Sequence, residues 1–473
     1  MQRRIAHAAD QLAFGILVSV LALSPFPVAS NRDGPVGVTS TALAFAVFCF
    51  LLAKTLGFAD SRIPTVTRSG LVFLAMVGAV VGWVWLGPLL VTFPALDVAR
   101  AEVYQLKALA YWCAPALVLF TARTRTRLTI LLTAIVVAGT LEAIIAVISL
   151  SAQAEFSLLG AAFFPTQRAQ GTFANPDHFA NYMAMCMSLA LGLMLATTPN
   201  ALRALPGWRG KVLGFLHFVM SRRMLVRLAV VIMVIGLVLS RSRMGNASFF
   251  IGLFFLLGAV AWAWPSKRQG AIWLGISLLV IDLVVIGQWV GLEHVMTRLQ
   301  NTELALAEQP EDAPPQLGGR PPKQEESVAE RLAIGQDAFK MALLSPWVGH
   351  GPATFFTLFP QNKRPAIFFW VEHAHNDYAE LAADLGLPAL LSLGGAVLIS
   401  LLQWAQLMHS TDSGFVKGLA SGAGMAVVCL LMHALVDFNL HIHANALLFT
   451  AALALPLALS RFTRTRHARQ PAL

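Results

Sequence analysis

The chain has 473 residues, of which 57% are hydrophobic and only 12% are charged, and its formal net charge at pH 7 is +10. Soluble domains carry about 25% charged residues, so this composition excludes an ordinary soluble protein and indicates an all-α polytopic membrane protein. The sequence contains no basic soluble domain with interleaved aromatic residues, which excludes a protein that binds nucleic acid. Its four cysteines stand singly in apolar runs, where we expect small buried hydrophobes.

Apolar runs long enough to cross about 30 Å of hydrocarbon recur along the whole chain. We expect about twelve membrane-spanning helices, near residues 11–30, 36–56, 69–90, 103–122, 128–150, 176–197, 224–240, 244–264, 270–291, 376–404, 416–437 and 442–460. These spans predict an N-terminal transmembrane bundle at 1–291, a large outer loop at 292–375 and C-terminal helices with a basic tail at 376–473.

Lysine and arginine gather in alternate connections between the spans, and such connections usually face the cytoplasm. The bias predicts that both termini are cytoplasmic. Four polar segments, far apart in the sequence, then fall together on the outer face: they contain Arg168, Arg241 with Arg243, His373 with His375, and His441 with His443. A shared site on that face explains this placement better than chance.

The outer loop has two parts. Residues 301–326 are rich in Pro, Gln and Glu, which predicts a disordered tether. The run Ser327-Val-Ala-Glu330 then resembles a capping box. It is expected to start an amphipathic helix, stopped by Pro346, with Val328, Leu332, Phe339 and Leu343 on one face. We expect this second half to form a lid on the bundle.

The first polar segment runs from Arg168 to His178. Asn175 as N-cap with Pro176 at the first helical position is a strong helix-start signal. Arg168 precedes that start in a short outer loop, where its guanidinium is suited to an anion at the membrane surface. The alternative is an interfacial arginine that pairs with lipid headgroups. We expect His178 to be a packed or hydrogen-bonded helix residue.

The second segment, Ser240-Arg241-Ser242-Arg243, joins two apolar runs with almost no loop. An arginine deep in hydrocarbon costs about 2.5–3.5 kcal/mol on insertion scales, so arginines in such places are usually paired or functional. A phosphate ligand would offset that cost, because arginine binds phosphate oxygens in a two-pronged fork. Snorkelling to the outer headgroups is the alternative.

The third segment, His373-Ala-His375-Asn376-Asp377, opens the tenth predicted span. Asn376 is a plausible N-cap, and acidic Asp377 suits the positive end of the helix dipole. His375 then lies just outside the helix, held by backbone and reachable from water. That is where a general base for a reaction at the membrane surface is needed.

The pairs His373-x-His375 and His441-x-His443 also invite a metal hypothesis. Residues two apart on a helix point in nearly opposite directions, so a pair would chelate only from an extended loop, with Asp437 or Glu372 completing the site. We favour a single catalytic His375, with the other histidines in structural roles. Asp437 follows His433 by four residues on one helix face, where it is placed to orient a partner.

Several of these motifs resemble those of a known family. His375-Asn376, followed after nine residues by Gly386-Leu-Pro388, is similar to the signature of bacterial O-antigen ligases and of related surface-polysaccharide polymerases. Four further stretches resemble that family in order and spacing between residues 165 and 450: Gly171-Thr-Phe-Ala-Asn-Pro, Ser242-Arg243, Arg331 with the later Pro346 and Gly349-His-Gly351, and His433-Ala-Leu-Val-Asp437-Phe.

The resemblance implies a C-type glycosyltransferase-like bundle in the bacterial inner membrane, with a periplasmic loop between the ninth and tenth spans. It implies transfer of a glycan from undecaprenyl diphosphate without a metal or other cofactor, and attack opposite the leaving group predicts inversion. His375 becomes the base, and Arg168 and Arg243 hold the diphosphate, with Arg241 as the alternative to Arg243. The expected supporting residues are Asn376, Asp377, His373, Asp437, Asn175 and Arg331.

Three functions are compatible with this resemblance and with the residues. The first is a ligase that joins the glycan to lipid A-core, and the second is a polymerase that extends the lipid-linked glycan by the same chemistry. The third is a transporter or lipid flippase, which would need polar residues at mid-membrane depth and inverted repeats. The polar clusters lie at one edge of the predicted bundle, which argues against the transporter. Nothing in the sequence separates the ligase from the polymerase, and we take the ligase as the first hypothesis.

Overall fold

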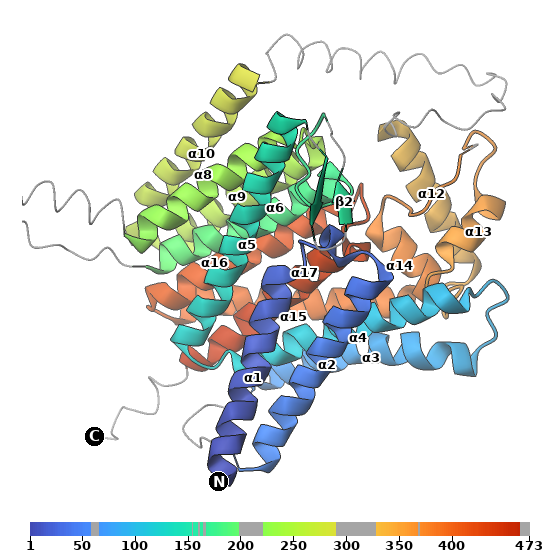
Figure 1. Ribbon diagram of the computed structural model, residues 1–473, viewed down its shortest axis with the longest axis horizontal. Helices are drawn as coiled ribbons and strands as arrows, with labels where there is room; N and C mark the ends of the chain where they lie inside the picture. The colour runs from blue at the N-terminus through green and yellow to red at the C-terminus, as the bar shows by residue number, and fades with distance from the viewer. Residues whose placement is uncertain are drawn as a thin grey trace, which may run out of the picture.

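The computed structural model describes the chain except residues 58–65, 154, 159–160, 164–166, 198–220, 290–327, 368 and 464–473. Within the described residues, ten helices are long and apolar enough to cross a membrane. They are α1 (Gln2–Leu23), α2 (Asp33–Thr55), α3 (Arg68–Leu90), α4 (Val98–Thr121), α5 (Arg125–Ala152), α6 (Pro176–Ala196), α9 (Arg243–Ala263), α15 (Leu387–Ser410), α16 (Gly414–His433) and α17 (His443–Leu459). The all-α polytopic fold is therefore confirmed (Figure 1).

Two further long helices, α8 (Arg222–Leu239) and α10 (Arg268–Trp289), occupy the remaining predicted spans. The short elements are α12 (Val328–Leu344), α13 (Phe355–Asn362), α14 (Asp377–Leu385), an antiparallel hairpin of β1 (Phe156–Leu158) and β2 (Ala161–Phe163), and the 3-10 turns η1 (Val28–Ser30), η2 (Pro265–Lys267), η3 (Asn439–His441) and η4 (Ser460–Phe462). The four cysteines are buried and unlinked, as expected.

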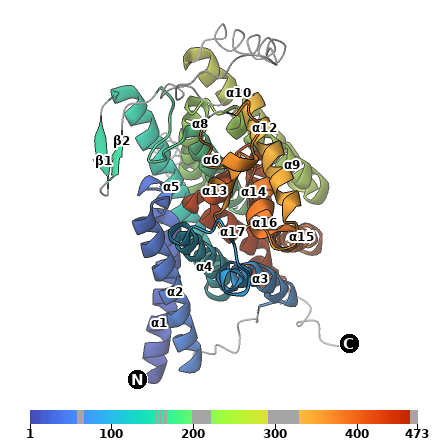
Figure 2. The same cartoon turned by 90° about the vertical axis from the view of Figure 1, so that its right-hand side faces the viewer.

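The centre of the bundle is formed by α6, α16 and α17, which are the most buried of the spanning helices. Helix α17 packs between α4 on one side and α16 with α6 on the other (Figure 2). Helices α6 and α16 approach closely because glycines face each other: a Cβ on Gly422 would lie 2.7 Å from the Cα of Gly192. Small residues at the contact are typical of packed membrane helices.

The tenth predicted span, 376–404, is two helices rather than one. Helix α14 ends at Leu385, and Gly386 follows it with a φ of +82°, in the left-handed region. Helix α15 then begins at Leu387, with Pro388 in its first turn. A Cβ on Gly386 would lie 2.7 Å from the carbonyl oxygen of Trp347, so the break needs glycine both for its backbone angle and for space.

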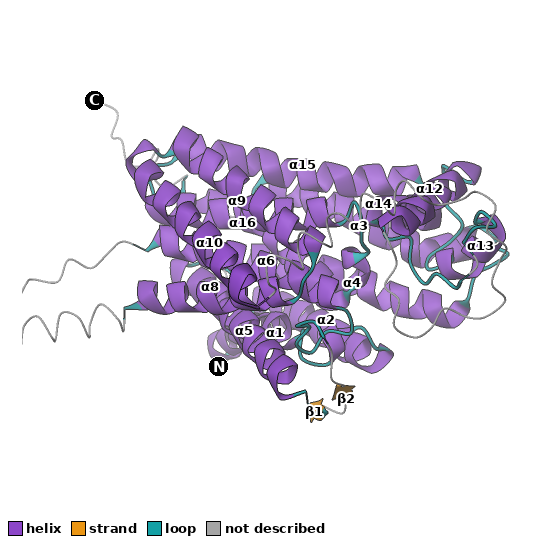
Figure 3. Ribbon diagram, turned by 90° about the horizontal axis from the view of Figure 1, so that it is seen from above, coloured by secondary structure: helices purple, strands orange, loops and turns teal. Residues whose placement is uncertain are grey.

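Helices α12, α13 and α14 gather at the end of the bundle that lies away from the C-terminus (Figure 3). The segment after α12 is fastened to the end of α14 by backbone hydrogen bonds. His350 N–H donates to the carbonyl of Ala383 at 2.9 Å, and Leu387 N–H donates to the carbonyl of Pro346 at 2.7 Å. The carboxylate of Asp384 accepts the N–H of Phe355 at 2.8 Å, at the start of α13. These hydrogen bonds hold the segment between α12 and α13 against the break at Gly386.

The lid helix α12 forms, but the apolar face predicted for it is not the face that packs against its neighbours. Leu332, Phe339 and Leu343 are exposed, whereas Ile334 and Met341 are buried with Ala338 and Ala342. The buried set packs against α13 and α14. The helix is apolar on two sides, so its pattern alone could not say which side meets the bundle. Ser327 and the tether at 301–326 lie outside the described residues.

Candidate active site

The loop before α6 is tied to the α8–α9 connection. Asn175 caps α6 as predicted, with its side chain accepting the N–H of Asp177 at 2.8 Å. The Nε–H of Arg168 donates to the carbonyl of Ser240 at 2.7 Å, and its terminal nitrogen pairs with the Asp177 carboxylate at 2.5 Å. Arg168 thus bridges two segments that were predicted to share one face.

The α8–α9 connection places its two arginines at the surface. Arg241 has a φ of +52° and, like Arg243, is exposed. Between them, the buried Ser242 caps α9 by accepting the N–H of Gly245 at 3.0 Å, and its side chain is hydrogen-bonded to Asp177. Arg241 and Arg243 therefore flank a serine that touches the Arg168–Asp177 pair.

His375 lies just before α14, as predicted. Asn376 caps that helix by accepting the N–H of Ala379 at 3.0 Å, and it donates to the carbonyl of Leu435 at 3.0 Å. His375 is buried and has a φ of +49°, an uncommon conformation for a residue with a Cβ. Such outliers persist only where surrounding contacts fix them, and they cluster at functional sites.

Asp437 is the centre of the site. It is completely buried, and three imidazoles surround its carboxylate: Nδ1 of His375 at 3.5 Å, Nε2 of His178 at 3.5 Å and Nε2 of His433 at 3.6 Å. Burial alone raises the pKa of a carboxyl, but the neighbouring His178, His375 and His433 hold the pKa of Asp437 well below its usual range. Asp437 is therefore an anion shared among three histidines.

Arg331 joins the lid to this centre. Its guanidinium, on α12, lies 3.0 Å from the Asp177 carboxylate and 3.9 Å from that of Asp437. A continuous chain of charged contacts consequently runs from Arg168 through Asp177, Arg331 and Asp437 to His375. Of the residues expected at the site, Arg168, Arg331, Asp437 and His375 are members of this chain.

Sequence reasoning missed two residues of the site, Asp177 and His178. Asp177 was not singled out, although an acidic residue directly after an N-cap and Pro176 was visible. His178 was expected to be a packed or hydrogen-bonded helix residue, with no role at the site. It does pack, with its ring centroid 4.5 Å from that of Phe438, but it also contacts Asp437. The signal that could have found it is the run of four polar or helix-starting residues at 175–178.

Asp377 and His373, expected as supporting residues, lie in a second cluster. The ring of Phe438 contacts His373 at 4.4 Å and His375 at 5.0 Å between centroids, so it stands between the two groups. Nδ1 of His373 lies 2.7 Å from Glu380, and His441 contacts Asp377 through Nδ1 at 3.0 Å and Glu380 through Nε2 at 3.2 Å.

The second cluster is an ion-pair network. Burial opposes the charge of His441, but Glu380 and Asp377 raise its pKa to about 9. Burial also opposes the charge of Glu380, whereas His441 and His373 lower its pKa to about 2. Burial raises the pKa of Asp377 to about 6. At neutral pH both partners of the His441–Glu380 pair are therefore charged.

The same cluster contains a set of potential metal ligands. Ligand atoms of His373, Glu380 and His441 all lie within 4.8 Å of one another, and two histidines with a glutamate suit zinc. However, both ring nitrogens of His441 face carboxylates, which satisfies an imidazolium without a metal. The pairs considered for chelation are separated: His375 faces Asp437, and His443 contacts Tyr111 at 3.2 Å.

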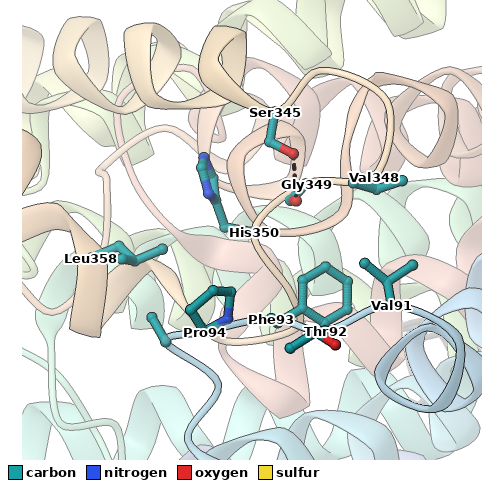
Figure 4. Close-up of a pocket in the computed structure, with 10 residues that line it drawn as sticks. Val91, Thr92, Phe93, Pro94, Ser345, Val348, Gly349, His350 and Leu358 are labelled. Carbon is teal, nitrogen blue, oxygen red and sulfur yellow. Dashed lines mark hydrogen bonds between the residues drawn. The ribbon is translucent and has the colours of Figure 1, made fainter.

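A cavity of about 260 Å³ lies between the α3–α4 connection and the lid (Figure 4). Residues 91–95 form one wall, and the other is formed by Ser345, residues 348–350 and Leu358. Within it the hydroxyl of Ser345 donates to the carbonyl of Gly349 at 2.7 Å. Neither His375 nor Asp437 lines this cavity, so the cavity is separate from the series of charged contacts that links Arg168 to His375.

Residues 228–394 match the family model described as O-antigen ligase. The matched segment includes Arg241, Arg243, Arg331 and His375 and ends within α15, whereas Arg168 and Asp437 lie outside it. No curated protein matches the chain.

Proposed function

We propose that this chain, whose residues 228–394 match the O-antigen ligase family model, transfers a glycan from undecaprenyl diphosphate to a hydroxyl acceptor. The domain indicates a ligase- or polymerase-type role in surface polysaccharide biosynthesis. We place the enzyme in the bacterial inner membrane, with both termini cytoplasmic and the His375–Asp437 site at the periplasmic face. The favoured acceptor is lipid A-core.

The observation that carries the proposal is the contact between His375 and Asp437. An anionic carboxylate 3.5 Å from Nδ1 favours the tautomer that carries its proton there. We assign proton acceptance to Nε2, which takes the proton of the acceptor hydroxyl as it attacks the anomeric carbon. Asp437 then stabilises the imidazolium. Such a base typically contributes about 10²–10⁴-fold to the rate.

Negative charge develops on the diphosphate as it leaves, and cationic side chains are needed to stabilise it. Arg168 is half-buried against Ser240 and Asp177, and the side chains of Arg241 and Arg243 reach the surface on either side of Ser242. We therefore propose that Arg241 and Arg243 receive the diphosphate first and that Arg168 completes its binding. Fixed guanidinium groups stabilise developing negative charge in a site of low dielectric. In other enzymes a bound metal ion stabilises such charge. Attack from the side opposite the diphosphate inverts the anomeric carbon.

The decisive experiment is a transfer assay with purified protein, undecaprenyl-diphosphate glycan and lipid A-core. We expect product with the wild type, and a large loss in the His375→Ala and Arg243→Ala variants. Arg268→Ala, which removes an exposed arginine at the start of α10, is the matched control and should behave like the wild type. Wild-type transfer by both site variants would contradict the roles assigned to His375 and Arg243. Absence of transfer by the wild type itself would contradict the enzyme hypothesis and favour a transporter.

A polymerase would use the same residues, so the acceptor decides between the two activities. Deletion of a ligase leaves bare core and accumulated lipid-linked polymer in the cell. Deletion of a polymerase leaves core that bears a single repeat unit. We expect the first outcome.

A further inference from the structure

Glu142 is a buried carboxyl that the proposed mechanism does not use. It lies on α5 and is completely buried. Both of its oxygens contact one residue of the loop before α6: Oε2 accepts the backbone N–H of Thr172 at 3.0 Å, and Oε1 lies 2.6 Å from the Thr172 hydroxyl. Two bonds from one carboxyl to one residue fix that residue closely.

The hydroxyl of Thr172 makes a second short contact, which determines where the protons are. Its oxygen lies 2.8 Å from the carbonyl oxygen of Pro25. A carbonyl can only accept, and a hydroxyl has one hydrogen to donate. If that hydrogen goes to Pro25, the 2.6 Å contact with Glu142 needs a hydrogen from the carboxyl itself. Both distances lie within the range of O–H···O hydrogen bonds.

The surroundings of Glu142 agree with a neutral acid. Among the residues that the structure describes, no lysine, arginine or histidine forms an ion pair with it. A buried, unpaired carboxylate in a membrane-spanning helix is strongly unfavourable, whereas a protonated carboxyl with its hydrogen bonds made is tolerated.

The contact lies in the middle of the loop that carries Arg168. Gly171 has a φ of +57°, and a Cβ on it would lie 2.4 Å from Oε2 of Glu142, so only glycine allows so close an approach. At the ends of the loop stand Arg168 and Asn175, the latter capping the helix that presents Asp177. Holding Thr172 in place therefore sets the position of the Arg168–Asp177 pair.

We propose that Glu142 is a protonated carboxylic acid that positions this loop, and hence Arg168, for the diphosphate donor. It is a positioning residue, not a catalytic one. Its effect on transfer rests on the function proposed above, whereas its protonation does not. The two parts are therefore tested by separate measurements.

Protonation is tested by infrared difference spectroscopy of wild type against Glu142→Gln. A carboxylic acid has a carbonyl band that a carboxylate lacks, and we expect the wild type to show one that disappears in E142Q. A band that shifts in Thr172→Val, which removes the hydroxyl at nearly constant shape, would assign it to this contact. Carboxylate bands in its place would overturn the proposal, whatever the outcome of any transfer assay.

Positioning is tested by kinetics on the folded protein. Glutamine can donate to the Thr172 hydroxyl and accept its N–H, so E142Q should keep kcat/KM within about threefold. Glu142→Leu fills the space without hydrogen bonds and should lose about tenfold or more, mainly through a higher KM for the lipid-linked donor. A purely structural role would lower the unfolding temperature of E142L but leave its KM unchanged, which overturns the positioning role. Equal KM values in E142Q and E142L would also overturn the positioning role, because they would show that the hydrogen bonds to Thr172 do not matter for donor binding. If E142L does not fold, Thr172→Val supplies the same KM comparison.

Discussion

The guanidinium of Arg331, on the lid helix α12, lies 3.0 Å from the carboxylate of Asp177, at the first turn of α6. This contact joins the lid directly to the most central layer of the bundle. Since the same guanidinium also faces Asp437 at 3.9 Å, the position of the lid and the charge of the site are coupled. Separating the lid from the bundle would leave two buried carboxylates without their shared cation.

The first prediction concerns that coupling. Arg331→Ala should lower the transfer rate by at least about tenfold and make the lid more sensitive to protease, because loss of one partner from a buried ion pair costs about 3–5 kcal/mol. The transfer assay and limited proteolysis check both effects. Arg364→Ala is the control: it breaks the pair with Asp337 at 2.8 Å, which is internal to the lid, and should leave transfer nearly intact. Equal effects of the two variants would contradict a special role for Arg331.

The second prediction concerns the base. Asp437→Asn keeps the shape of the side chain but removes the charge shared by His375, His178 and His433. We expect a loss of about 10²-fold or more in kcat, because the amide no longer stabilises the imidazolium of His375. KM for the donor should change less. His178→Gln serves as comparison, since it removes a neighbour of Asp437 without removing the base.

The sequence predicted the local features of the site but not the contacts between its distant segments. The N-caps Asn175 and Asn376 were predicted correctly, because capping depends on neighbours within four residues. The association of His375 with Asp437 was not derivable from spacing, since the two are on different segments and only tertiary packing brings them together. The position of the Phe438 ring between His373 and His375 likewise depends on tertiary packing.

The third prediction concerns pH. The pKa of His441 is raised from 6.5 to about 9, so the stabilisation it contributes is complete below pH 6.5 and is lost as the pH rises toward 9. The pKa of Glu380 is lowered from 4.5 to about 2, so its contribution is complete above pH 4.5 and is lost as the pH falls toward 2. Both contributions are therefore complete only between pH 4.5 and 6.5.

Thermal unfolding of wild type and His441→Gln over this range tests the prediction. The gap in unfolding temperature should be largest between pH 4.5 and 6.5 and should shrink toward pH 9. His409→Gln, which changes an exposed histidine at the end of α15, should show no such trend. A gap that widens toward pH 9 would mean that His441 is neutral in the folded protein.

The fourth prediction concerns metal removal. Because the hydrogen bonds of His373, Glu380 and His441 satisfy one another, we expect chelator-treated protein to keep both its transfer rate and its unfolding temperature. Metal content of the purified protein should be the same for wild type and His373→Ala. Stoichiometric zinc in the wild type that is lost in the variant would instead show that these ligands hold a metal.

The last prediction concerns the helix break at Gly386. Its φ of +82° and the 2.7 Å approach of the Trp347 carbonyl to a would-be Cβ both oppose any side chain there. Gly386→Ala should therefore lower the unfolding temperature and weaken the contact between the lid and α14, with a cost of about 1–3 kcal/mol for the strained backbone. Gly394→Ala is a matched control on the following helix, because a Cβ there would meet nothing within 4 Å. Alanine is favoured over glycine in a helix by about 1 kcal/mol, so this control should be neutral or slightly stabilising. If both variants unfold at the wild-type temperature and transfer at the wild-type rate, the break is not what fixes the lid beside His375.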